Sequence, residues 1–221
     1  MPGVLALVGG EEFSEGCSFD ADLAVRSGAD EVLVVPTGAA YEHPQRLVER
    51  AIGWFDRLDV RAVGLDLLAR PDAFDQTHID RVRSARFLYL VGGSPMHLRS
   101  VLKDSPAWDA LCQAWDDGAV LAGSSAGAMV LCDPMVDPRG GAFTLGLGLV
   151  ANLAVIPAHN RWSEDAAHRT LKMSPPGLAL VGIDERTALV RDIDGSWKTE
   201  GAGSVAVFQG GKPADLSSLP D

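Results

Sequence analysis

The chain has 221 residues, of which 47% are hydrophobic and 22% are charged. This composition is typical of a folded globular protein and excludes a mainly disordered or fibrous chain. Its 30 acidic and 19 basic side chains give a formal net charge of −11. A surface this acidic repels phosphate backbones, so nucleic acid is excluded from the expected partners.

The three cysteines, Cys17, Cys112 and Cys132, predict neither a disulfide framework nor a zinc site, because their spacings are unrelated. They favour a reducing compartment. The first residues lack the basic start and long apolar run of a signal peptide, and no apolar stretch reaches the roughly 20 residues of a membrane span. We therefore expect a cytoplasmic protein that has no membrane partner.

Short apolar runs alternate with amphipathic stretches along the chain. Nearly continuous apolar runs are typical of buried parallel strands, and a 3.6-residue period is typical of helices. In chain order the pattern predicts a strand over 4–8, a helix over 21–26, a strand over 32–35, a helix over 44–58, a strand over 60–65, a helix over 77–84, a strand over 87–91, a helix over 106–117, strands over 120–122 and 153–156, a helix over 163–173 and a strand over 178–183.

This alternation predicts an α/β fold of three layers, in which a mostly parallel, doubly wound sheet carries helices on both faces. Residues 187–191 and 204–208 are predicted to form an antiparallel edge of that sheet around a turn at 194–195. No linker or repeat divides the sequence, so we expect a single domain over residues 1–221. In open sheets of this kind, functional residues gather where strands end.

The most specific motif, Gly123-Ser124-Ser125-Ala126-Gly127, follows the strand predicted at 120–122. A glycine two residues before and after Ser125 permits a sharp strand-to-helix turn that exposes the hydroxyl. The same turn leaves the amide N–H of Ala126 free at a helix start, where it can donate to an oxyanion. The motif predicts Ser125 as a nucleophile, and the alternative is a tight turn capped by Ser124 or Ser125.

A nucleophilic serine needs a base, and histidine is the usual base at neutral pH. His159 follows the strand predicted at 153–156, so we expect it at the same edge of the sheet as Ser125. The other four histidines lie at predicted helix starts, near a glycine pair or inside a helix: His43, His78, His97 and His168.

The base in turn needs an acceptor that fixes its tautomer and stabilises its cation. Asp184 and Glu185 close the strand predicted at 178–183. Successive side chains on a strand point to opposite sides, so only one of the two carboxylates can face the site. The spacing alone does not select between them.

Taken together, the motifs resemble those of the peptidase E (aspartyl dipeptidase) and cyanophycinase family of serine hydrolases. The resemblance runs from about residue 4 to about residue 212, and it implies a class I glutamine amidotransferase-like fold with serine in place of cysteine at the elbow. The motifs that carry it are GGEE after the first strand, VGGS after Tyr89-Leu90, GSSAGA, LGLGLV before a strand ending in PAH, and GIDERTAL.

Carried over by motif, the resemblance implies a triad of Ser125 as nucleophile, His159 as base and Glu185 as acid. It also implies an oxyanion hole formed by the backbone amides of Gly93 and Ala126. The chain order serine, histidine, glutamate differs from the serine, acid, histidine order of α/β-hydrolases. No cofactor or metal is implied, and the candidate substrate-binding residues are Ser94, Asn160 and Arg161.

The substrate implied by the resemblance is a small peptide or isopeptide with an aspartyl-type amide. Cyanophycinases carry an aspartate–glutamine pair before the base and arginines after it, whereas this chain has Pro157-Ala158 at the pair. Arg161 and Arg169 are out of register with those arginines, and they are the candidates for binding a carboxylate. Cyanophycin itself is therefore not expected as the substrate. A homodimer is a further expectation.

Two other classes of protein stay open at this point. One is a catalytically altered amidotransferase-like protein that acts as a small-molecule binding or regulatory module. The other is a Rossmann-type nucleotide-binding domain, which needs a glycine fingerprint followed by an acid about 20 residues later. The run Gly9-Gly10-Glu11-Glu12 does not have that spacing. A lid rich in proline and glycine is suggested for residues 133–141.

Overall fold

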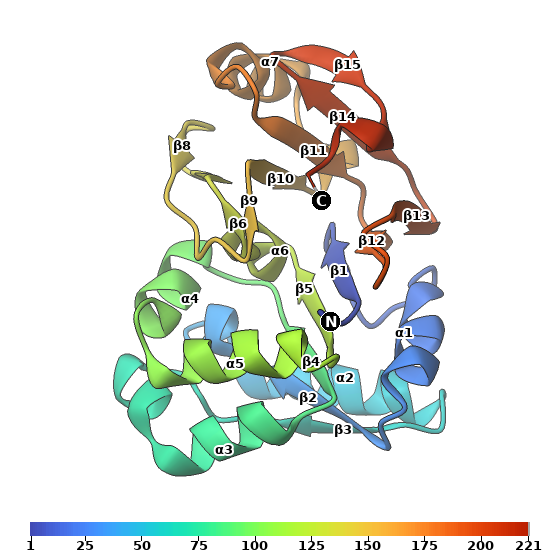
Figure 1. The fold of residues 1–221 in the computed structure, drawn as a ribbon, viewed down its shortest axis with the longest axis vertical. Helices are drawn as coiled ribbons and strands as arrows, with labels where there is room; N and C mark the ends of the chain where they lie inside the picture. Colours follow the sequence, from blue (N-terminus) through green and yellow to red (C-terminus); the bar gives the residue numbers. More distant parts are fainter. Residues whose placement is uncertain (221) are drawn as a thin grey trace.

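The computed structural model describes the backbone of residues 1–220 and the side chains of residues 1–163 and 169–220. Its larger sheet contains five parallel strands, β1 (Leu5–Val8), β2 (Glu31–Val35), β3 (Arg61–Gly64), β4 (Phe87–Leu90) and β5 (Val120–Ser124). Beyond β1 follow β12 (Thr187–Arg191), antiparallel to both of its neighbours, and β13 (Trp197–Gly201). The spatial order is β13-β12-β1-β5-β4-β2-β3 (Figure 1).

Alternate residues of the parallel strands face two separate apolar cores, as the pleat of a strand requires. Leu5 and Leu7 of β1 pack in the core beneath α3 (Gln76–Ser84), α4 (Pro95–Leu102) and α5 (Pro106–Asp116). Ala6 and Val8 pack in the core beneath α1 (Phe19–Ser27) and α2 (Pro44–Asp56). The predicted α/β architecture, with a mostly parallel sheet and helices on both faces, is therefore confirmed.

A second sheet corrects one part of the prediction. The strands expected at 153–156, 178–183 and 204–208 do not join the larger sheet but form β10 (Leu153–Pro157), β11 (Ala179–Ile183) and β14 (Val205–Gln209), with β15 (Lys212–Ala214) at the edge. The reason is that β12 occupies the free edge of β1 and so closes it to β10 and β11. The chain leaves the second sheet after β11, forms β12 and β13 in the first sheet, and returns as β14.

The remaining elements are short, apart from α7 (Glu164–Met173), which connects β10 to β11. The sequence prediction omits α4 and β13. No helix among residues 1–220 combines the length and apolar character that crossing a membrane requires. The other short elements are α6 (Ala126–Leu131), β6 (Cys132–Asp133), β7 (Met135–Val136), β8 (Phe143–Thr144), β9 (Val150–Ala151), η1 (Thr37–Ala39), η2 (Arg70–Phe74), η3 (His159–Arg161) and η4 (Leu216–Ser218).

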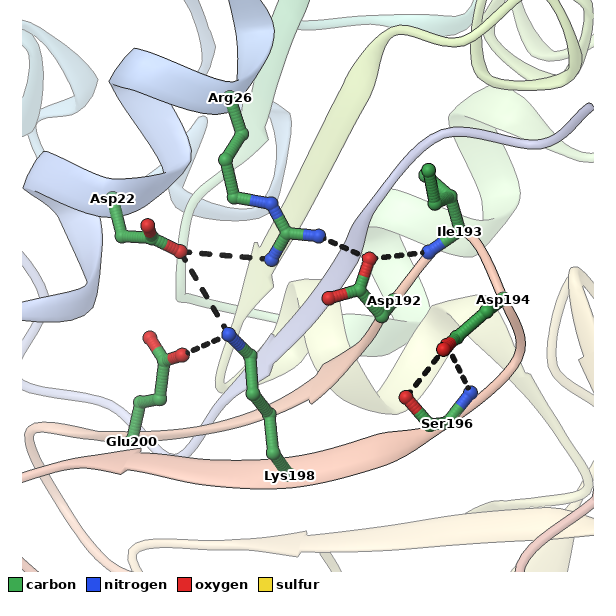
Figure 2. A network of polar contacts seen from close by, with 8 residues as sticks. All are labelled: Asp22, Arg26, Asp192, Ile193, Asp194, Ser196, Lys198 and Glu200. Carbon is green, nitrogen blue, oxygen red and sulfur yellow. Dashed lines mark hydrogen bonds and ion pairs between the residues drawn. The ribbon is translucent and has the colours of Figure 1, made fainter.

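A polar network joins the hairpin of β12 and β13 to α1 (Figure 2). Arg26 of α1 pairs with Asp192 in the hairpin and lies 3.5 Å from Asp22 on its own helix. Lys198 of β13 lies 3.9 Å from the same Asp22 carboxylate and 2.5 Å from Glu200. Partly exposed ion pairs add little stability, so the network chiefly fixes where the antiparallel edge lies against α1.

Candidate active site

Ser125 occupies the turn between β5 and α6, and its backbone is strained. Its φ of 50° and ψ of −106° lie outside the regions that residues with a side chain normally adopt. Two hydrogen bonds hold this conformation: the Ser125 amide donates to Val8 O at 2.8 Å, and its carbonyl accepts from Met129 N at 3.0 Å. The predicted sharp turn is therefore present at Ser125.

The two glycines of the motif are required by close backbone contacts. A Cβ at Gly123 would lie 2.7 Å from the backbone of Gly127, and one at Gly127 would lie 2.4 Å from the carbonyl oxygen of Leu90. Neither distance is compatible with a side chain. The Gly-x-Ser-x-Gly spacing is thus a packing requirement of the strand-to-helix turn.

The loop after β4 lies beside the serine, since a Cβ at Gly92 would be 3.5 Å from Ser125 Cβ. Gly93 has a φ of 123°, and a Cβ there would lie 2.3 Å from the carbonyl oxygen of Gly38. The amide of Ser94 donates to that same Gly38 oxygen at 2.8 Å, which fixes the loop against η1. Among the described residues, the amides of Gly93 and Ala126 donate to no protein acceptor, so both are available to an oxyanion.

Two cavities open on Ser125. The first has a volume of about 430 Å³ and is lined mainly by apolar side chains with two arginines, and the second, of about 310 Å³, is lined by four carboxylates. Both include Gly93 and Ser125. The first is lined by Gly93, Pro95, Ser125, Met129, Pro138, Arg139, Gly140, Gly141, Pro157, Trp162 and Arg169. The second is lined by Gly9, Gly10, Glu11, Glu12, Glu42, Leu47, Gly92, Gly93, Ser125, Ala158 and Glu185. Part of the segment suggested as a lid, residues 138–141, thus forms a wall of the first cavity.

His159 begins η3, directly after β10. The preceding residue, Ala158, donates its amide to Gly9 O at 2.7 Å, which brings the end of β10 to the end of β1. The imidazole packs over Gly182 of β11, where a Cβ would come within 2.4 Å of the ring. Its Nδ1 lies 3.8 Å from Asp184 Oδ1. Within the described part of the chain, the Ser125 hydroxyl has no hydrogen bond, so the serine and the imidazole are not joined in this arrangement.

The two candidate acids have different partners. Glu185 accepts a hydrogen bond from Arg161 Nε at 2.9 Å and one from Asn160 Nδ2 at 3.4 Å. The Arg161 hydrogen bond lowers the pKa of the Glu185 carboxyl below its usual range. Asp184 instead accepts from the amide and the hydroxyl of Ser204, at 3.0 and 2.8 Å. The structure thus brings Asp184 toward His159 and brings Glu185 to Asn160 and Arg161.

The predicted substrate-binding residues divide in the same way. Ser94 caps α4, because its Oγ accepts from His97 N at 3.2 Å. Asn160 and Arg161 hold Glu185, whereas Arg169 lines the first cavity and pairs with no side chain that the structure describes. Of the other histidines, His78 and His97 bond to backbone carbonyls, His43 precedes α2, and the side chain of His168 lies outside the described residues.

Sequence reasoning missed Glu12, which is 4% exposed and lies between the two loops of the site. Its Oε2 accepts from the Ser124 hydroxyl at 2.8 Å, and its Oε1 accepts from Gly92 N at 3.3 Å. The GGEE motif was informative only as a family signature. The signal that could have found Glu12 is a pair of acids directly after a glycine pair at a strand end, where a solvated loop is the more common outcome.

A strained serine between a parallel strand and a helix, beside free amides, is typical of α/β enzymes that hydrolyse acyl compounds through a nucleophilic serine. The model of peptidase family S51 matches residues 5–196, and the chain belongs to this family. The protein is therefore a hydrolase that acts on amide bonds. The predicted resemblance to the peptidase E and cyanophycinase family is confirmed.

Individual relatives agree with this family. The cyanophycinase of Thermosynechococcus vestitus is 26% identical over 226 residues, covering 97% of this chain and 69% of that protein. The cyanophycinase of a Nostoc species is 28% identical over 97% of this chain and 74% of that protein. The crystal structure of a peptidase from an acI-B1 actinobacterium is similar with a TM-score of 0.85 and 32% identity, covering 95% of this chain and 92% of that one. A putative peptidase E from Listeria monocytogenes shares the fold, with a TM-score of 0.67, 16% identity and coverage of 95% and 99%.

Proposed function

We propose that this peptidase cleaves a small peptide or isopeptide through an acyl-enzyme on Ser125, with His159 as the base and Glu185 as the acid. The observation that carries the proposal is the strained turn that presents Ser125 to both cavities, beside the free amides of Gly93 and Ala126. A turn that served only to connect β5 to α6 would not need this strain.

The proposed reaction uses only groups of this chain and water. His159 takes the proton from Ser125 as Oγ attacks the amide carbonyl, and the oxyanion accepts from Gly93 and Ala126. His159 then gives the proton to the leaving amine, and water releases the acyl group by the same sequence. The first step requires the imidazole to rotate from the surface of β11 toward Ser125, which its position at a strand end and its 26% exposed side chain permit.

Glu185 is our choice for the acid because of where its carboxylate lies. It lines the second cavity together with Ser125 and Ala158, the residue before His159. Asp184 is nearer to the imidazole in this arrangement, but 3.8 Å exceeds a hydrogen-bond distance, and its Oδ2 already accepts two hydrogen bonds from Ser204. We therefore assign Asp184 to holding the start of β14.

The first cavity supports a substrate with a carboxylate. Apart from Ser125, its wall is apolar except for two guanidinium groups, and that of Arg139 is already paired with Asp137 through two hydrogen bonds. Arg169 has no such partner among the described side chains, and a guanidinium can bind a carboxylate through two parallel hydrogen bonds. An aspartyl peptide or isopeptide, or the free C-terminus of a dipeptide, would supply that carboxylate.

Labelling by a fluorophosphonate and hydrolysis of a panel of dipeptides and β-aspartyl isopeptides test this function. We expect wild type to be labelled on Ser125 and Ser125→Ala to lose both labelling and hydrolysis. The matched control is Ser100→Ala, which changes an exposed serine of α4 and should keep both activities. Wild-type labelling at another serine would refute the assignment. A folded wild type that is neither labelled nor hydrolytic would favour the binding or regulatory module instead.

A further inference from the structure

Glu12 connects three separate segments of the chain at the edge of the site. It follows β1, and its carboxylate accepts from Gly92 in the loop after β4 and from Ser124 at the end of β5. Its Oε1 also lies 3.8 Å from Arg50 Nη2 of α2. Since β1, β5 and β4 are adjacent in the sheet, one side chain reaches across the ends of all three strands.

The two donors have no alternative to Glu12. Ser124 is fully buried, and its hydroxyl and the Gly92 amide make no other hydrogen bond within the described residues. Leaving two buried donors unpaired is costly, so the carboxylate fixes the distance between the two segments. Ser124 precedes the nucleophile and Gly92 precedes the oxyanion amide of Gly93. A Cβ at Gly92 would lie 3.5 Å from both Glu12 Oε1 and Ser125 Cβ, which shows how closely the three residues pack.

The charge of Glu12 does not explain its presence, because a carboxylate disfavours an oxyanion that develops nearby. Its two hydrogen bonds do explain it, since one is made to each of the two segments. We infer that Glu12 is a positioning residue. It holds the turn that carries Ser125 and the loop that carries Gly93 at the separation that attack on a substrate requires. This inference rests on the proposed roles of Ser125 and Gly93.

The test compares rates of fluorophosphonate labelling in the full chain, each measured well below the thermal midpoint of the variant. Glu12→Ala should slow labelling by about 100-fold, the cost of misplacing reacting groups by about 1 Å. Glu12→Gln should stay within about threefold of wild type, because its amide oxygen can accept from Gly92 while its amide N–H donates to the Ser124 oxygen. Ser124→Ala removes one of the two bonds and should slow labelling by about fivefold.

The control is Glu15→Gln, which removes the same charge from an exposed position in the same loop and should label like wild type. Labelling of folded Glu12→Ala at the wild-type rate would overturn the inference and leave Glu12 a purely structural residue. A Glu12→Gln variant that is as slow as Glu12→Ala would also overturn it, since charge rather than hydrogen bonding would then matter. If Glu12→Ala does not fold, the inference is overturned by a Ser124→Ala variant that labels at the wild-type rate or by a Glu12→Gln variant that labels about 100-fold more slowly than wild type. Absence of wild-type labelling on Ser125 would instead refute the proposed function itself.

Discussion

The hydroxyl of Ser125 is half-buried, whereas the residues on either side of it are fully buried. This difference arises from the positive φ of Ser125, which lifts one side chain out of a tightly packed turn. Around it, the roles of the neighbouring groups follow from their contacts: free amides can donate to a substrate, and paired side chains hold the site in shape. Single substitutions of these side chains therefore test the proposed mechanism most directly.

The first test asks whether Glu185 or Asp184 is the acid that supports His159. We expect Glu185→Gln to lower kcat by about 10² to 10⁴-fold, because a neutral amide stabilises the imidazolium poorly. Asp184→Asn should lower kcat less than about tenfold and should lower the thermal midpoint, since it weakens the bonds to Ser204. Steady-state kinetics with a substrate found in the peptide panel provide the measurement. If Asp184→Asn is the more damaging change, the acid is Asp184.

The carboxylate-binding role of Arg169 gives a second test. Arg169→Ala should raise KM by about 10 to 100-fold for a substrate that carries a carboxylate, with kcat nearly unchanged, because a charged hydrogen bond is lost in the ground and transition states alike. The matched control is the same peptide with an amide in place of that carboxylate, for which the two enzymes should be alike. An equal change in KM for both peptides would show that Arg169 contributes packing only.

Among the helices and strands, a buried acid of α1 bonds to α2 and lies near Tyr89 of β4. Asp20 of α1 accepts from Trp54 Nε1 of α2 at 2.8 Å. Its other oxygen, and the hydroxyl of Tyr89 on β4, are buried without a hydrogen-bond partner among the described residues. Burial, together with the nearby charge of Glu12, raises the pKa of Asp20 from 3.8 to about 8. Folded protein therefore keeps a proton that the unfolded chain releases near pH 4.

The raised pKa of Asp20 makes the stability of the folded protein depend on pH. Between about pH 4 and pH 8 the native state binds one more proton at Asp20 than the unfolded state, so this contribution to stability falls as pH rises and levels off above pH 8. Asp20→Asn should flatten the decline of the thermal midpoint between pH 5 and pH 8. Asp56→Asn, an exposed change on α2, is the control and should keep the wild-type slope. Parallel curves for wild type and Asp20→Asn would contradict the prediction.

The elements themselves differ in how well the sequence predicts them. The central strands β1, β2, β4 and β5 of the larger sheet are predictable because each is a short, nearly continuous apolar run that is buried on both faces. The second sheet is not, since its separation depends on β12 pairing with β1, a contact between distant residues. In the site, local motifs identify the turn at Ser125 and the strand end at His159. The orientation of the imidazole over Gly182 and the bridge formed by Glu12 depend on tertiary contacts that no local pattern contains.

For the whole molecule, the path of the chain between the two sheets has a thermodynamic consequence. The chain passes from β11 in the second sheet to β12 and β13 in the first and then returns to β14, so neither sheet is made from one continuous segment. The C-terminal end adds a further connection, because Trp197 Nε1 of β13 donates to Pro220 O at 2.8 Å. Neither sheet can therefore be completed without the other.

We accordingly expect one cooperative unfolding transition. Thermal melts followed by far-ultraviolet circular dichroism and by tryptophan fluorescence should coincide, because both probes would report the same all-or-none event. This result would also support the prediction of a single domain over residues 1–221. Two resolved transitions, or midpoints that differ between the probes, would mean that the two sheets unfold separately.

The strained backbone at Ser125 also has a consequence for the evolution of the protein. A conformation of this kind costs about 1–3 kcal/mol, and glycine would adopt it without that cost. In a descendant that no longer needed catalytic activity, replacement of Ser125 by glycine would thus increase the stability of the fold. Under the proposed role of Ser125, only selection for catalysis keeps a serine at this position, because glycine there would make the fold more stable.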